Sequence, residues 1–233
     1  MYGGYYYGFD PTFLLLIIGM VLSLAASARL KKTFNTYSRV RSASGMTGAQ
    51  AAQRILNAKG LYDVKVVAIR GNLTDHYDPR TKQVCLSEAS YGQNSLAAVG
   101  VAAHECGHAV QHAENYGPLN LRSTLVPIAN LGSSLSWPLF LIGLIFSMRP
   151  LLSAGIILFS AAVLFQLVTL PVEYNASSRA LRLLEGTGIL GAGEVEGSRK
   201  VLSAAAMTYV AALAGSVLQL LRLLILAGGR NRD

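Results

Sequence analysis

Long runs without a charged residue place the strongest limit on the fold of this chain. Arg122 and Arg149 enclose 26 uncharged residues, and Arg149 and Glu173 enclose another 23. Near the N-terminus, Asp10 and Arg29 enclose 18 uncharged residues that are mostly aliphatic. Because about 20 apolar residues suffice for a helix to cross a bilayer, we expect an N-terminal transmembrane helix and, later in the chain, a transmembrane hairpin.

The composition agrees with a membrane protein. Hydrophobic residues make up 52% of the 233 residues and charged residues only 14%, against roughly 25% charged in soluble domains. The net charge is +8, but the basic residues flank the apolar runs as topology signals do, and they form no stripe with interleaved aromatics. We therefore expect a lipid bilayer as a partner and no nucleic acid. Residues 1–9 are rich in Gly and Tyr and form either an aromatic anchor or an unstructured terminus.

A cluster of basic residues follows the first apolar run. The positive-inside rule then places the N-terminus outside and residue 30 onward in the cytoplasm. The members of the cluster are Arg29, Lys31, Lys32, Arg39 and Arg41.

A His-Glu-x-x-His pattern occupies His104–His108. On a helix, positions i and i+4 lie on one face about one turn apart, so His104 and His108 can hold one zinc ion. Glu105 points toward the same side, where it can act as a general base without being a ligand. The alternative is a helix whose two histidines have ordinary hydrogen-bond partners and no metal.

The residues around this pattern predict a buried helix. Asn94 or Ser95 can cap it, and apolar residues cover it nearly all round. Buried histidines and a buried glutamate need partners, which a metal would supply. Cys106 lies about 200° round the helix from His104, so we expect a small buried residue and not a ligand. With Cys85 as the other cysteine, the chain has too few for a disulfide framework.

The rest of residues 30–122 predicts a small α+β part. Thr47 or Ser44 can cap a helix, and Val64–Ile69 predicts a strand. Two further short strands are expected, at Asp75–Tyr77 and Gln83–Leu86. An edge strand beside a metal can pair with an extended peptide, although it can also simply close a small sheet.

A catalytic zinc site needs a third protein ligand. The hairpin returns the chain at Glu173, which we expect to open a new helix at the membrane surface, with Ser177 one turn further on. We predict Glu173 as the third ligand, and the alternative is an acidic residue that stabilises the N-terminus of that helix. His112 lies roughly 12 Å along the axis from His104, too far to share the ion. His76, before a turn, is a surface residue or a substrate contact.

The C-terminal region leaves two possibilities open. Arg199 and Lys200 precede 21 uncharged residues, Val201–Leu221, and Arg222 follows. The segment is either a fourth span or a helix docked on the catalytic part. Arg222 counts against a simple span unless it snorkels or pairs. Tyr209 in this segment can reach the site as a hydrogen-bond donor.

With these motifs, the chain resembles the YugP-like family of bacterial membrane zinc peptidases over nearly its whole length. It is also distantly similar to HtpX-type membrane metalloproteases, in which a hairpin separates the histidine helix from a glutamate ligand. The most similar stretches are Thr74–Arg80, Ala103–Gln111, Leu170–Ala180 and Thr208–Ala212.

This resemblance implies that His104, His108 and Glu173 bind Zn²⁺. It implies that Glu105 is the catalytic acid/base. The chain departs from the HtpX-type pattern at one position, because those sequences have an Asp four residues after the ligand glutamate, where this chain has Ser177. A hydroxyl orients a ligand histidine less strongly than a carboxylate does.

The expected fold is an α+β membrane protein, mostly helical, with a small cytoplasmic gluzincin-like domain that contains a short β-sheet. The expected parts are an N-terminal transmembrane helix (1–29), a zinc-peptidase part (30–122), a transmembrane hairpin (123–172) and a third-ligand helix with a C-terminal helical region (173–233).

The expected function is that of a multi-pass cell-membrane zinc metalloendopeptidase, which cleaves membrane-associated proteins or peptides at the cytoplasmic surface. The alternative is a metal-stabilised membrane scaffold or chaperone with little or no proteolysis. A transporter is disfavoured because the runs of 26 and 23 residues contain no ionisable group.

Overall fold

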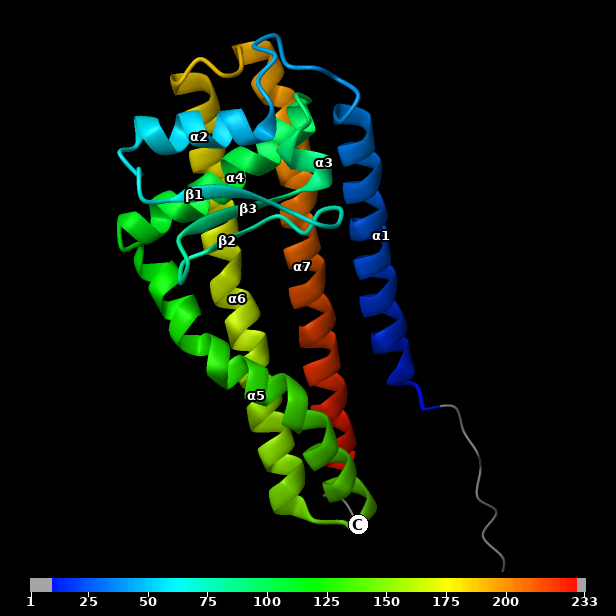
Figure 1. Ribbon diagram of the computed structural model, residues 1–233. Helices are drawn as coiled ribbons and strands as arrows, with labels where there is room; N and C mark the ends of the chain where they lie inside the picture. The colour runs from blue at the N-terminus through cyan, green and yellow to red at the C-terminus, as the bar shows by residue number, and fades with distance from the viewer. Residues whose placement is uncertain (1–9, 230–233) are drawn as a thin grey trace, which may run out of the picture. The chain divides into compact units, whose positions relative to one another are not determined.

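The computed structural model describes residues 10–229, which are mostly helical with one three-stranded sheet, as expected (Figure 1). The aromatic anchor suggested for residues 1–9 lies outside the described residues. The helices are α1 (Phe13–Tyr37), α2 (Gly48–Ala58), α3 (Glu88–Tyr91), α4 (Leu96–Ala113), α5 (Gly117–Ile145), α6 (Arg149–Gly186) and α7 (Ala192–Gly229). The strands are β1 (Lys65–Ile69), β2 (His76–Asp78) and β3 (Gln83–Ser87).

The chain divides into two compact units. Of the described residues, the first unit, which we call the apolar unit, contains those up to Leu24, Pro127–Leu164 and those from Ala211 onward. The second, which we call the site unit, contains Ala25–Val126 and Phe165–Val210. All the residues predicted to bind metal or to catalyse lie in the site unit.

Within residues 10–229, four helices, α1, α5, α6 and α7, are long and apolar enough to cross a membrane. They include the predicted N-terminal span and the predicted hairpin. Helix α7 is one continuous helix of 38 residues, so its length allows the fourth span that the sequence left open.

Helix α6 differs from the prediction. It is one helix of 38 residues that continues through Pro171, so Glu173 lies inside it and does not open a new helix. A proline costs one backbone hydrogen bond, but long membrane helices tolerate this loss because neighbouring groups satisfy the freed carbonyl. The alternative role of Glu173 as an acid at a helix N-terminus is therefore wrong, since the helix begins far upstream.

Arg222 is paired inside the apolar unit. Its side chain is 9% exposed, and Nη2 lies 3.5 Å from Oδ2 of Asp10. Its Nε donates to Oγ1 of Thr12 at 3.2 Å, and the guanidinium lies 4.6 Å from the ring centre of Phe13. Because these contacts join the start of α1 and the residues just before it to the last part of α7, the charge of Arg222 is compatible with a membrane helix.

Local sequence explains the short elements of the site unit. Thr47 caps α2 in a reciprocal capping box with Gln50, and Gly60 after that helix has a φ of 71°, which favours glycine. Ser95 accepts a hydrogen bond from Ala98 N and caps α4, as one of the two expected caps.

The sheet has the order β1-β3-β2. Strand β1 runs parallel to β3, and β2 pairs antiparallel with β3, so that His76 lies opposite Cys85 and Asp78 opposite Gln83. All three strands were predicted to within a few residues. Strand β2 lies at one edge of the sheet, and no strand among the described residues pairs with its outer side.

The core of the site unit fixes α4 against its neighbours. Helices α2 and α4 pack together, and both contact the sheet. Fully buried side chains of this core come from α2, β3, α4 and α6 and include Ile55, Leu56, Val84, Leu86, Val99 and Leu184. A densely packed interior of this kind holds the polar side chains of α4 in one orientation.

Candidate metal centre

Helix α4 carries the His-Glu-x-x-His pattern within the site unit. Glu105 is 7% exposed and His108 is 8% exposed, and the rings of His104 and His108 lie with their centres 4.8 Å apart. Cys106 points into the core instead, where its Sγ lies 3.6 Å from the carbonyl oxygen of Ala52. The prediction that Cys106 is buried is confirmed.

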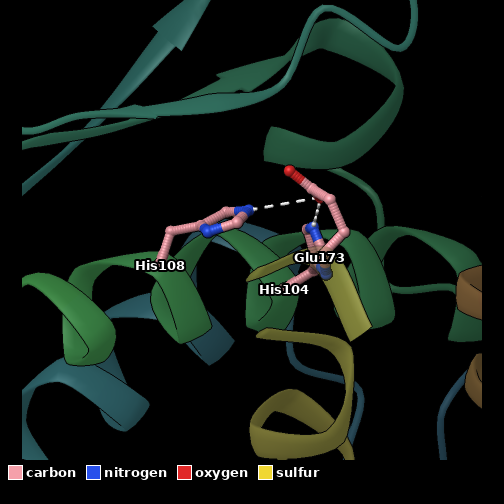
Figure 2. Close-up of side chains that lie close together, drawn as sticks. All are labelled: His104, His108 and Glu173. Atoms are coloured by element: carbon pink, nitrogen blue, oxygen red, sulfur yellow. Dashed lines mark hydrogen bonds and ion pairs between the residues drawn. The ribbon is translucent and has the colours of Figure 1, made fainter. Parts of the chain in front are cut away.

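Glu173 on α6 meets both histidines, although 69 residues separate it from His104 in sequence. Its Oε2 lies 3.3 Å from Nε2 of His104 and 3.6 Å from Nε2 of His108. Figure 2 shows the carboxylate reaching from α6 over the two imidazoles, which project from consecutive turns of α4. Among the described residues, these three form a group whose donor atoms lie within 4.8 Å of one another and can hold a metal ion.

The spacing of Glu173 from each of the two histidines fits zinc. Two ligand atoms that lie about 2.1 Å from one ion in a tetrahedral arrangement are roughly 3.4 Å apart. The distances of 3.3 and 3.6 Å between Glu173 and the two histidines bracket this value. Two imidazoles and one carboxylate are also a donor set of catalytic zinc sites, which keep a fourth position open.

Hydrogen bonds at Nδ1, the ring nitrogen that does not face Glu173, set the orientation of both imidazoles. Nδ1 of His108 lies 3.0 Å from Oε1 of Gln111, and Nδ1 of His104 lies 3.1 Å from Oγ of Ser177. When Nδ1 carries the proton and is held in this way, Nε2 presents its lone pair to a metal. The sequence indicated that Ser177 supports the site, but it gave no sign that Gln111 does.

Gln111 is fully buried and links α4 to α6. Its Nε2 donates to the carbonyl oxygen of Val172 at 2.8 Å and to Oδ1 of Asn175 at 3.0 Å. With both amide protons engaged, Oε1 of Gln111 faces Nδ1 of His108 and accepts its proton. With Nδ1 held by Gln111 in this way, Nε2 is the nitrogen of His108 that faces Glu173 and is free to bind a metal in place of a proton.

The electrostatics of the site favour a cation. Burial raises the pKa of Glu105, and the charges of His104 and His108 oppose this shift. Burial alone would lower the pKa of His108, but its hydrogen bond to Glu173 and the charges of Glu105 and Glu173 outweigh burial, and the net pKa is raised. The carboxylates of Glu105 and Glu173 therefore stabilise positive charge at His108, as a divalent-cation site also requires.

A polar cleft of about 600 Å³ opens over the triad. Its walls include Asp75, His76 and Tyr77 from the region of β2, together with Arg122 and Tyr209. The cleft connects the group formed by the two histidines and Glu173 to solvent.

Arg122 was not identified as a site residue from the sequence. Its Nη1 lies 4.0 Å from Oε1 of Glu173, and its guanidinium lies 6.0 Å from the ring centre of Phe165. The only sequence signal was its place as the last charge before an apolar run. Arg122 provides a positive charge behind the carboxylate oxygen that faces away from the histidines.

The two remaining histidines lie outside the metal group. Nδ1 of His112 is 2.8 Å from the hydroxyl of Tyr77, which connects the end of α4 to β2. Burial raises the pKa of Tyr77 to about 12, so its hydroxyl stays protonated at neutral pH. His76 is exposed and lines the cleft, with Nδ1 3.0 Å from the carbonyl oxygen of Thr74.

Apolar helices and a group of two histidines and one glutamate define a membrane protein with a zinc-type metal centre. The chain belongs to the family described as "Putative neutral zinc metallopeptidase", whose sequence profile matches residues 12–228. It is 50% identical over 220 residues to "Putative membrane protease YugP" of Bacillus subtilis (strain 168), which covers 94% of this chain and 98% of the relative. No solved structure matches the chain significantly. The family resemblance inferred from the motifs is confirmed, and zinc is the metal of this family.

Proposed function

We propose that the protein is a zinc metalloendopeptidase with a gluzincin-like site that cleaves membrane-associated proteins or peptides. One observation carries this proposal: Glu105 is buried beside a group of two histidines and Glu173 in an open cleft. Ligands, a general base and access for a chain are the parts that metal-assisted hydrolysis needs.

Each site residue has its own role in the proposed hydrolysis of a peptide bond. His104, His108 and Glu173 would hold zinc, which would supply a Lewis acid for the scissile carbonyl and for a water molecule. Glu105 takes the proton of the attacking water and passes it to the leaving amine. The raised pKa of Glu105 suits this role, because a base that will later act as an acid works best with a pKa near the working pH. Tyr209 lines the cleft, and in this proposal its hydroxyl donates a hydrogen bond to the substrate.

Strand β2 positions the substrate in this proposal. It lies at the edge of the sheet, and His76 and Tyr77 on it line the cleft above the triad. An extended peptide can therefore add to the sheet through main-chain hydrogen bonds, independently of its sequence. This arrangement would present a backbone carbonyl to the metal group.

The site faces the cytoplasm in this proposal. The positive charges that follow the first apolar segment lie in the site unit, and the positive-inside rule assigns that side to the cytoplasm. Substrates would then be membrane proteins or peptides that reach the cytoplasmic membrane surface in an extended form.

Substitution of Glu105 tests the proposal. Zinc-loaded wild type, Glu105→Gln and the surface control Glu88→Gln are incubated in detergent with a library of internally quenched peptides. We expect the wild type and Glu88→Gln to cleave, and Glu105→Gln to be at least about 100-fold slower with unchanged zinc content. Equal rates for the wild type and Glu105→Gln would overturn the proposal. A zinc-loaded wild type that cleaves nothing would favour the metal-stabilised scaffold.

The third ligand has its own test. Glu173→Ala is compared with Glu185→Ala, which removes an exposed carboxylate from the same helix. We expect Glu185→Ala to keep one zinc per chain and Glu173→Ala to lose most of its zinc in metal analysis after dialysis. Full zinc stoichiometry and affinity in Glu173→Ala would show that the ligand assignment is wrong.

A further inference from the structure

A second cavity adjoins the triad on the side of α1 and α7. It has a volume of about 170 Å³ and is distinct from the polar cleft. The two cavities share five wall residues, which are Asp75, His104, Glu105, Glu173 and Tyr209. A chain that lies in the cleft with a carbonyl at the metal group therefore has this second cavity next to its reacting bond.

The walls of the second cavity are apolar apart from the shared site residues, Ser177 and Thr208. They come from α1, the loop before β2, α4 and α7, and comprise Leu30, Phe34, Leu73, Val101, Val201, Leu202, Ala205 and Ala206. The polar cleft differs in character, because it contains Arg80, Arg122, His76 and His112. The two sides of the metal group thus offer different chemistry to a bound peptide.

The size of the cavity matches one side chain. An apolar cavity of about 150 Å³ takes up benzene, so a cavity of about 170 Å³ holds a leucine- or phenylalanine-sized group. Among the described wall residues, Asp75 is the one acidic residue besides Glu173 of the metal group and the general base Glu105. Its two carboxylate oxygens already accept hydrogen bonds from N and Oγ of Ser87, at 2.8 and 2.9 Å. Asp75 is therefore held by the protein and does not make the cavity a site for a cation.

We propose that this cavity is the specificity subsite for an apolar side chain directly beside the scissile bond. The inference rests on the proposed peptidase function and names its substrate class: extended segments with Leu, Met or Phe next to the cleaved bond. A charged side chain would be excluded because nothing in the apolar wall compensates the loss of its hydration. Alanine would be accepted poorly, since it leaves the cavity partly empty. Apolar segments of membrane proteins are rich in the side chains that fit.

Ala205 offers a way to fill the cavity without touching the metal group or the base. Ala205→Leu adds bulk inside the cavity, and Met207→Leu is the control, because Met207 is exposed on the same helix and does not line the cavity. Phe34→Ala enlarges the cavity from the opposite wall. Zinc content is measured for each variant, so that a folding defect is recognised.

Two readouts separate this inference from the proposed function. The first is kcat/KM for peptides that differ only at the residue beside the cleaved bond, namely Ala, Leu, Phe or Asp. We expect the wild type and Met207→Leu to prefer Leu or Phe over Ala by about 10-fold or more, and Asp to be the poorest. For Ala205→Leu, kcat/KM should fall about 10-fold for the Phe peptide and less than about 2-fold for the Ala peptide. For Phe34→Ala, kcat/KM for the Phe peptide should rise relative to kcat/KM for the Leu peptide.

The second readout is binding of peptide hydroxamates, which needs zinc but no turnover. Hydroxamates with a methyl, isobutyl or benzyl side chain are titrated into the zinc-loaded proteins. Tighter binding of the larger groups by the wild type, lost in Ala205→Leu, would support the subsite even if no peptide were cleaved. In that case only the peptidase proposal would fail. Equal affinities for the three inhibitors, or a preference that Ala205→Leu leaves unchanged, would overturn the subsite even if peptides are cleaved.

Discussion

Gly107 of α4 lies directly against the main-chain carbonyl of Ala176 on α6. A Cβ added to Gly107 would be 2.6 Å from the carbonyl oxygen of Ala176, closer than real Cβ atoms approach. Each of these residues is next to a site residue, because His108 follows Gly107 and Ser177 follows Ala176. The close approach of the two helices at this point lets one glutamate on α6 reach two histidines on α4.

Gly107→Ala should therefore loosen the metal site as well as the packing. The methyl group meets backbone, which cannot rotate away, so α4 and α6 must separate. We expect a destabilisation of about 1–3 kcal/mol and weaker zinc binding. Thermal unfolding of the metal-free protein and a chelator competition for zinc measure the two effects.

Gly186→Ala is the matched control, because a Cβ at Gly186 on α6 meets nothing within 4 Å. It should leave both the unfolding temperature and the zinc affinity at the wild-type values. If Gly107→Ala behaved in the same way, the helices would not be in contact at this point.

Gln111→Leu should weaken zinc binding although Gln111 is not a ligand. The change removes the acceptor for Nδ1 of His108 and the donors to Val172 and Asn175. Loss of a group that orients a ligand histidine typically costs about 10–100-fold in metal affinity. A chelator competition measures the change, with Gln53→Leu on the exposed face of α2 as the control. An unchanged dissociation constant would contradict the orienting role.

Ser177 allows a test in both directions. Ser177→Ala removes the hydrogen bond to Nδ1 of His104, and we expect roughly 10-fold weaker zinc binding. Ser177→Asp supplies a stronger acceptor and should bind zinc at least as tightly as the wild type. Ser178→Ala, at the neighbouring exposed position, should have no effect. Equal zinc affinity for Ser177→Ala and Ser178→Ala would show that Ser177 does not hold the histidine.

Glu105 should reduce the stability of the metal-free protein at neutral pH. Burial raises its pKa in the folded state above the unfolded value, so the folded state binds this proton more tightly. Stability then falls as the pH rises from the unfolded pKa through the folded pKa, and the loss is complete above both. In chelator, Glu105→Gln should melt at a higher temperature than the wild type at pH 8, and this difference should shrink as the pH falls toward 4. A lower melting temperature for Glu105→Gln at pH 8 would contradict the burial argument.

The sequence by itself determined the features that depend on local spacing. Hydrophobic run lengths predicted the long helices, turn and capping residues predicted α2 and the three strands, and an i, i+4 spacing predicted that His104 and His108 share a helix face. The bias of α4 toward apolar residues also predicted that Cys106 and Glu105 are buried. These properties follow from the periodicity of a helix or strand, which any short window of sequence contains.

Only the tertiary structure decided which distant groups meet. The distance between Glu173 and the histidines, the bonds from Gln111 to α6, the charge of Arg122 and the apolar cavity all join segments that are far apart in the chain. The sequence also predicted a helix start at Glu173, because a charge after a long apolar run resembles a boundary, whereas packing carries α6 onward past Pro171. Such contacts depend on how whole helices pack against one another, and that packing is set by the shapes of many side chains together and not by any local pattern.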